Sequence, residues 1–295
     1  MKSPLPVVEG VAPSRQTLPA GVWETVLDFL AERHASVGAD VWVSRMLKGE
    51  VVDETGLRLT PSSPYRAGAC VFYYREPEDE PRVPFDEHIL YRDEHLIVAD
   101  KPHFLPVVPS GRFLRETLLV RLKRQTGERH LVPLHRIDRE TAGLVVFSVD
   151  PSTRGAYASL FQRREVSKVY EALAPAADTL ELPCTRRSHI VVGEPFFRMK
   201  EVEGEPNSET RFRLLACAGA ASLYEARPVT GRKHQVRLHL AALGIPVINE
   251  RLYPTMLPPR APDNFKDPLK LLARSVSFRD PVTGHERHFE SERKL

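Results

Sequence analysis

The last two thirds of the chain carry a succession of short apolar segments, and these constrain the fold more than any other feature. Segments rich in branched and aromatic residues and bounded by turn residues predict strands. They occur at 89–91, 96–98, 144–149, 166–174, 208–217, 221–228, 271–279 and 285–290. Helical spacing of apolar residues is found at 114–122, 152–162 and 236–243. Since strands outnumber helices and several are joined by short turns, we expect an α+β domain with a mixed, mostly antiparallel sheet.

An acidic, proline-rich stretch separates this region from the first part of the chain. The stretch EPEDEPRVP at 76–84 predicts a linker, which we place at 77–84, followed by a large domain at 85–295. Before it, two helical patterns and two strand-like segments predict a small α+β domain at 21–76. Residues 1–20 contain four prolines, so we expect them to form an irregular tail.

Charge and cysteine content exclude several classes of protein. The 42 Lys and Arg residues are nearly balanced by 39 Asp and Glu, so no polybasic tail dominates the chain. The three cysteines are far apart in the sequence, which argues against a disulfide scaffold and fits a reducing compartment. No run of about 18 apolar residues and no signal peptide are present, so we expect a cytoplasmic protein.

The segment HRIDRETAG at 135–143 is the first candidate site, directly before a buried strand. Asp138 lies there among His135, Arg136 and Arg139. Nearby cations favour the ionised form of a carboxylate, and an ionised carboxylate can act as a nucleophile or a base. A structural salt bridge would explain the same residues.

Lys168 and Tyr170 form a second candidate, because period two places them on one face of the predicted strand at 166–174. An aromatic ring beside a cation suits stacking on a nucleic-acid base near a phosphate. An ordinary half-exposed strand would show the same pattern.

The third candidate is TGRKHQVRLHL at 230–240, a turn followed by a helical pattern. It gathers basic residues at a helix N-terminus, which favours anions. A zinc site at His234 and His239 is rejected, because their spacing is not that of an HExxH motif and no carboxylate lies between them. A solvated basic helix is the alternative.

Together these segments resemble the RluA-type family of RNA pseudouridine synthases. The family motif His-Arg-Leu-Asp-x-x-Thr-Ser-Gly is matched at 135–143, with Ile137 and Ala142 as replacements. The Lys-x-Tyr strand is matched at 168–170, and Thr-Gly-Arg-x-His-Gln-Ile-Arg-x-His at 230–239. The resemblance covers about residues 86–290. It departs from the family at 249–251, where Asn-Glu-Arg replaces Gly-Asp, and at Leu272, where histidine is common.

The resemblance implies a central cleft in which a uridine in RNA becomes pseudouridine, with no cofactor and no metal. The bond from ribose C1′ to uracil N1 breaks, and the base rotates and rejoins through C5. Asp138 would be the essential carboxylate, Tyr170 would stack on the flipped uracil and assist removal of the C5 proton, and Arg237 would pair with Asp138. Expected RNA-binding residues are Arg136, Lys168, Arg232, His234 and Gln235.

Other resemblances concern the partner. Residues 108–113 resemble a subgroup that modifies hairpins of tRNA or rRNA, so we expect a structured RNA as substrate and a monomeric enzyme. Residues 45–51 and 68–71 loosely resemble the small RNA-binding domain named after ribosomal protein S-four, although a small cap without an RNA role fits as well. Two alternatives stay open: a non-catalytic RNA-binding or assembly protein, and a carboxylate-dependent nucleoside glycosidase, which would need a second acidic group.

Overall fold

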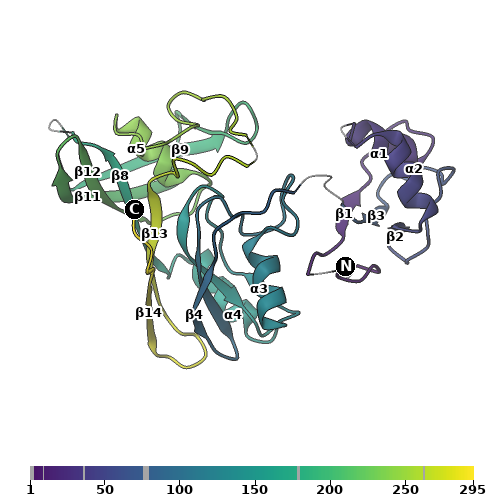
Figure 1. Ribbon diagram of the computed structural model, residues 1–295, viewed down its shortest axis with the longest axis horizontal. Coiled ribbons are helices and arrows are strands. Elements are labelled where there is room, and N and C mark those ends of the chain that lie inside the picture. The colour runs from purple at the N-terminus through teal and green to yellow at the C-terminus, as the bar shows by residue number, and fades with distance from the viewer. Residues whose placement is uncertain (1–2, 9, 36, 76–79, 178–179, 262) are drawn as a thin grey trace. The chain divides into compact units, whose positions relative to one another are not determined.

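The chain consists of two compact units, Met1–Glu80 and Pro81–Leu295. The computed structural model describes residues 3–8, 10–35, 37–75, 80–177, 180–261 and 263–295 (Figure 1). The division falls inside the linker expected at 77–84, of which residues 77–79 lie outside the described ones. No helix within the described ranges is long and apolar enough to cross a membrane.

The small unit packs two helices against a three-stranded antiparallel sheet in the order β1-β3-β2. A capping box starts α1, because Thr25 accepts from the backbone of Asp28 while the Asp28 carboxylate bonds back to the Thr25 backbone. The elements are β1 (Ser14–Thr17), α1 (Val26–Arg33), α2 (Ala39–Leu47), β2 (Val51–Asp53) and β3 (Cys70–Tyr73).

The expectation of an irregular tail over residues 1–20 is wrong in part. Ser14–Thr17 pairs with β3, and Leu18 is buried in the core of the small unit. Pro13 and Pro19 flank the strand without entering it, so the ladder keeps all its donors. Four residues between two prolines are too short a stretch to show a period-two pattern.

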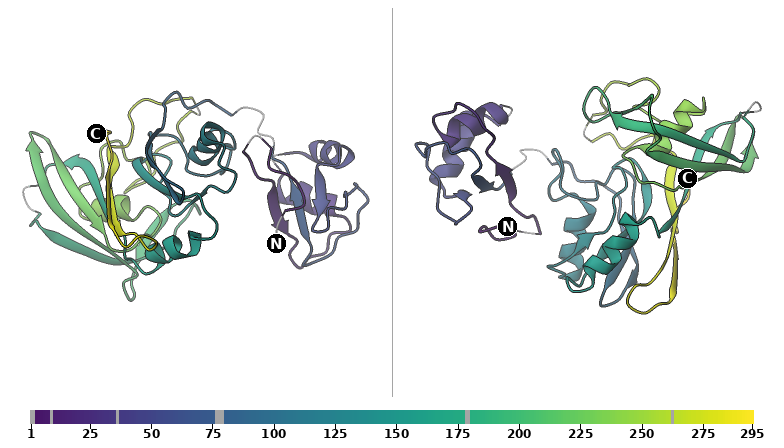
Figure 2. Two further views of the ribbon diagram at one scale, coloured as in Figure 1. Left: turned by 90° about the horizontal axis from the view of Figure 1, so that it is seen from below. Right: turned by 180° about the vertical axis from the view of Figure 1, so that it is seen from behind.

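The large unit contains an 11-stranded sheet among its described residues, with three helices (Figure 2). The order is β10-β9-β11-β12-β8-β13-β7-β5-β4, with β14 added to β13 and β6 to β7. The elements are β4 (His88–Arg92), β5 (Leu96–Lys101), α3 (Leu118–Thr126), β6 (Val132–Pro133), β7 (Ala142–Ser148), α4 (Arg154–Gln162), β8 (Ser167–Pro175), β9 (Cys184–Val192), β10 (Met199–Val202), β11 (Ser208–Ala218), β12 (Ala221–Pro228), α5 (Gln235–Ala242), β13 (Leu271–Arg279) and β14 (Glu286–Glu290).

This sheet confirms the expected mixed, mostly antiparallel architecture, since β13 and β7 form its parallel pair among the described strands. The sequence did not indicate β9 and β10. Helix α3 begins after Thr117 rather than at 114, and α4 is preceded by Thr153 at its N-cap position. The pattern at 152–162 also suggested Ser152 as the N-cap, but its hydroxyl donates to the Asp150 carboxylate.

The parallel pairing of β7 with β13, yellow in Figure 1, fixes where the candidate loop lies. Gly143 has a φ of +109°, and a Cβ there would lie 2.3 Å from the Ala273 carbonyl oxygen. Glycine is required for this close approach. On the neighbouring part of the sheet, α5 packs through Val236 and Leu240 onto a cluster that includes Ala172 of β8. The loop before β7 and helix α5 therefore border the same region.

Candidate active site

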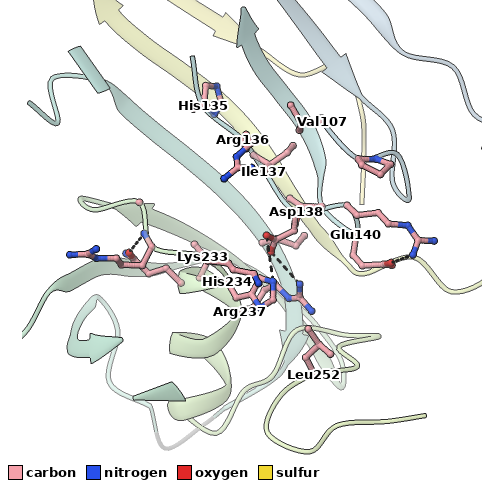
Figure 3. Close-up of a pocket in the computed structure, with 18 of the residues that line it drawn as sticks. Val107, His135, Arg136, Ile137, Asp138, Glu140, Lys233, His234, Arg237 and Leu252 are labelled. Carbon is pink, nitrogen blue, oxygen red and sulfur yellow. Dashed lines mark hydrogen bonds and ion pairs between the residues drawn. The ribbon is translucent and has the colours of Figure 1, made fainter. Parts of the chain in front are cut away.

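Asp138 lies at the bottom of a cleft in the large unit, on the loop that leads into β7 (Figure 3). The buried side chain of Ile137 anchors the loop, and the Thr141 backbone donates to the Asp138 carbonyl at 3.1 Å. The cleft has a volume of about 1080 Å³. Pockets for small molecules have roughly 300–1,000 Å³, so the space exceeds what a nucleoside alone requires.

Arg237 of α5 is the cation that engages Asp138. Its Nη1 donates to Asp138 Oδ2 at 3.2 Å, while Nε and Nη2 donate to both oxygens of Glu250 at 2.7 and 2.6 Å. The side chains of Arg237 and Glu250 are only 4% and 2% exposed. Backbone amides of Arg251 and Leu252 also donate to Glu250 Oε1. The guanidinium therefore has one fixed orientation, with one edge held by Glu250 and a remaining donor directed at Asp138.

His234 flanks Asp138 from the other side. Its Nε2 is 3.7 Å from Asp138 Oδ1, and its Nδ1 lies 2.8 Å from the hydroxyl of Tyr253. Burial is the main cause that lowers the pKa of His234, to about 4. His234 is therefore uncharged at neutral pH, and Arg237 supplies the positive charge next to Asp138.

The electrostatic surroundings keep Asp138 ionised. Burial alone would raise the pKa of its carboxyl group, but the charge and hydrogen bond of Arg237 and the ammonium of the buried Lys101 oppose burial, and the pKa is lowered. Burial would likewise lower the pKa of Arg237, yet its carboxylate partners raise it. An ionised carboxylate held beside a permanent cation is ready to act as a nucleophile or a base.

The interpretation that His135 and Arg139 supply cations to Asp138 is wrong. His135 accepts from the Val146 backbone at 3.1 Å, and burial lowers its pKa to about 3, so it is neutral. Arg139 donates to the Phe104 carbonyl at 3.0 Å and lies 4.8 Å from the Phe113 ring centroid. Sequence neighbours of Asp138 thus anchor the loop, and the charge comes from α5, 99 residues away.

Tyr170 and Lys168 of β8 line the same cleft. Tyr170 is half-buried, and burial together with the charge of Asp138 raises the pKa of its phenol. Tyr170 is therefore a neutral phenol, suited to stacking and hydrogen bonding but not to removing a proton. Burial lowers the pKa of Lys168, the second residue on this face.

The cleft is strongly basic. Ten of its lining residues are Arg or Lys, whereas its carboxylates are Asp138 and Glu140. Arg136 and Arg232, both predicted to bind RNA, are exposed at this lining. An excess of positive over negative side chains in a concave surface attracts polyanions.

The RNA-binding role expected for Gln235 does not agree with its environment. Its side chain is buried and bonds to Thr230, Thr210, the Glu209 carbonyl and the Arg232 backbone. These contacts occupy the amide and join the 230–235 turn to β11. Gln235 is a structural residue of the loop.

Three residues were missed in the sequence: Phe197, which lines the cleft, and Glu250 and Tyr253, which contact its lining residues. Glu250 makes the shortest hydrogen bonds to Arg237. It stands where the family has aspartate, and this match of acidic residues could have identified it from the sequence. Tyr253 and Phe197 reach the site from a loop and from the β9–β10 hairpin, for which no motif was recognised. Among the described residues, no group of three or more His, Cys, Asp or Glu is placed to hold a metal ion.

Comparison with known proteins agrees with this geometry. Residues 95–242 match the family model described as RNA pseudouridylate synthase. An uncharacterized RNA pseudouridine synthase of Synechocystis sp. is 33% identical, over 77% of this chain and 79% of its own. Ribosomal large subunit pseudouridine synthase D of Pseudomonas aeruginosa is 29% identical, with 69% and 67% of the two chains covered.

Two further comparisons extend to other RNAs and to structure. The mitochondrial tRNA pseudouridine(32) synthase of Saccharomyces cerevisiae is 27% identical over 65% of this chain and 42% of its own. The solved structure of human RNA pseudouridylate synthase domain containing 1 shares the fold, with a TM-score of 0.57 and 22% identity over 72% of this chain and 86% of that one. The chain belongs to the RluA-type family of RNA pseudouridine synthases, isomerases that convert uridine in RNA to pseudouridine.

Proposed function

We propose that Asp138 is the carboxylate that reacts with the target nucleoside. The ion pair with Arg237 keeps it charged at neutral pH, and its side chain, 25% exposed, lines the cleft where a nucleoside can reach it. The target base must leave its stack to reach such a position, at a cost of roughly a few kcal/mol. Cleavage of the N1–C1′ bond then frees the uracil to turn and form a new bond from C5 to C1′. C5 loses its proton and N1 takes one up, so the reaction is a net isomerisation.

Tyr170 and Arg237 have different supporting roles. The neutral ring of Tyr170 stacks on the flipped uracil, and its raised pKa argues against the idea that it removes the C5 proton. Arg237 orients and stabilises the Asp138 carboxylate, since its other edge is fixed by Glu250. His234 acts as a positioning residue through its contact with Asp138.

Arg136, Lys168 and Arg232 contact RNA phosphates or bases in this proposal, because they line the cleft and belong to its cationic surplus. The substrate is a hairpin of tRNA or rRNA, supported by the relatives named for those RNAs. We further propose a cytoplasmic monomer, which gel filtration and cell fractionation would test.

One observation carries the proposal: a half-buried, charge-paired Asp138 at the bottom of a cleft with ten basic residues and two carboxylates. A glycosidase would need a second carboxylate as acid. The second carboxylate of the cleft lining, Glu140, lies 3.6 Å from Arg139 Nη1, and Glu250, outside that lining, is enclosed and accepts from Arg237 through both oxygens.

The test compares Asp138→Asn with wild type and with Asp86→Asn, an exposed aspartate outside the cleft lining. RNA from cells lacking this protein is incubated with each variant, and pseudouridine is mapped by carbodiimide modification. We expect Asp138→Asn to abolish pseudouridine formation and to keep RNA binding and folding, while Asp86→Asn retains activity. Full activity of Asp138→Asn would overturn the assignment. Release of free uracil would indicate a glycosidase, and binding without modification by wild type would indicate an assembly protein.

A further inference from the structure

We propose that Phe196 and Phe197, at the tip of the β9–β10 hairpin, stack on an unpaired base of the substrate RNA next to the target uridine. The side chains are 80% and 40% exposed, and Phe197 lines the cleft that contains Asp138. Large aromatic side chains at the rim of a nucleic-acid site provide stacking platforms for bases. This inference rests on the proposed RNA cleft and adds a contact that recognises unpaired nucleotides.

The two rings have a geometry suited to a single base. Their centroids are 5.7 Å apart, and their planes are inclined by 78°. Because the rings are nearly perpendicular, they cannot both lie parallel to one base. One ring offers its face, and the other supports it edge-on, as in favourable aromatic pairs.

The residues that directly follow the two rings are fixed to the active site. The Met199 backbone donates to the Tyr253 hydroxyl at 2.8 Å, and Arg198 donates to the Pro254 carbonyl at 3.0 Å. The same Tyr253 hydroxyl lies 2.8 Å from His234, which flanks Asp138. The aromatic tip is therefore held in a defined position relative to the reacting carboxylate, as a contact next to the target nucleotide requires.

The surroundings favour an RNA base over a protein partner. Protein interfaces bury roughly 800 Å² on each partner. Here the apolar surface is interrupted close to the two rings, because the exposed charged residues Glu194 and Lys200 flank them along the chain. Glu194 also disfavours a phosphate at this position, so the contact is with the face of a base. Bases within a duplex have both faces covered by their neighbours, and recognition of this kind therefore selects loops, bulges and ends.

The experiment measures pseudouridine formation on RNA from cells lacking this protein, as a function of RNA concentration. Three double variants are compared with wild type: alanine at both positions, F196L/F197L, and F196Y/F197Y. Val282→Ala, an exposed apolar residue in the turn between β13 and β14, is the control. Stacking on one base contributes about 1–3 kcal/mol, which is about 5- to 150-fold in affinity.

We expect the alanine and leucine variants to raise the apparent KM about tenfold or more, with kcat changed less than about threefold. The tyrosine variant keeps a planar ring and should stay close to wild type. A leucine variant equal to wild type would show that apolar area alone is needed, and would overturn stacking. If the alanine variant equals wild type while Asp138→Asn is inactive, the hairpin proposal fails and the catalytic assignment stands.

Discussion

The bottom and the rim of the cleft are built on opposite principles. At the bottom, Asp138, Arg237 and Glu250 form a network in which each guanidinium nitrogen has a carboxylate partner, and the side chains of Arg237 and Glu250 are buried. At the rim, Arg136 and Arg232 are exposed to solvent. Buried charges depend strongly on their partners, whereas exposed charges gain little from each other. The bottom is thus committed to one geometry, and the rim stays available for a ligand.

The largest expected effect comes from Arg237→Ala. It leaves Glu250 buried without its cation, which costs about 3–5 kcal/mol of folding free energy. Activity should fall roughly 100-fold or more, because Asp138 loses its fixed donor. Chemical denaturation and pseudouridine formation measure the two effects.

The double variant Arg237→Ala/Glu250→Ala separates them. Removing both charges should restore much of the stability and none of the activity, since the unpaired carboxylate is gone while Asp138 still lacks its partner. Equal stability of the single and double variants would show that the ion pair does not hold the bottom of the cleft together.

An intermediate effect is expected from pH, through the buried His239 of α5. Its ring is fully buried among Thr210, Ser188 and Ser208, and burial lowers its pKa to about 4. The unfolded chain binds the proton near pH 6.5 and the folded chain only near pH 4. The stabilisation is therefore complete above pH 6.5 and is lost as pH falls toward 4, by about 2 kcal/mol between pH 7 and pH 5.

Thermal unfolding of wild type and His239→Gln at the two pH values checks this sign. The variant should have a lower melting temperature than wild type at pH 7. Its melting temperature should fall less than that of wild type between pH 7 and pH 5. His285→Gln, at an exposed turn, should keep the wild-type difference. If the melting temperature of His239→Gln falls as much as that of wild type, then other buried groups cause the acid sensitivity.

The smallest effect is predicted at the rim. Arg232→Ala should weaken RNA binding and reduce the slope of log affinity against log salt by about 1, with stability changed by no more than about 0.5 kcal/mol. Arg92→Ala, an exposed arginine paired with Glu128 outside the cleft lining, should leave the slope unchanged. If Arg232→Ala were destabilised, residues at the rim would also support the fold, and the contrast in stability between the rim and the bottom of the cleft would not hold.

Periodicity and turn residues predicted most of the large sheet, including β11, β12, β13 and β14. They failed for β9 and β10, whose apolar residues are interrupted by charged ones such as Arg186 and Glu201. Those two side chains pair with each other across the strands, so the charges are compatible with a sheet. Cross-strand partners of this kind are not visible without the register.

The candidate site was predictable in its parts but not in its connections. The motifs identified Asp138, Tyr170 and Arg237, and the cleft brings all three together. From the local sequence, the wrong cations were assigned to Asp138 and an RNA-binding role was assigned to Gln235. The local sequence cannot show which polar side chains already form hydrogen bonds within the protein. Whether a polar group is free depends on tertiary contacts, here with β11 and Phe104.

The position of β13 has a consequence for how the enzyme is made. This strand lies between β7 and β8, so it joins the half of the sheet that holds the Asp138 loop to the half that carries α5. Its residues, Leu271–Arg279, are translated after almost all of both halves. A nascent chain on the ribosome can pair each half separately, but their hydrogen-bonded union waits for β13 to emerge. The cleft, whose lining comes from both halves, is therefore complete only after β13 has been added.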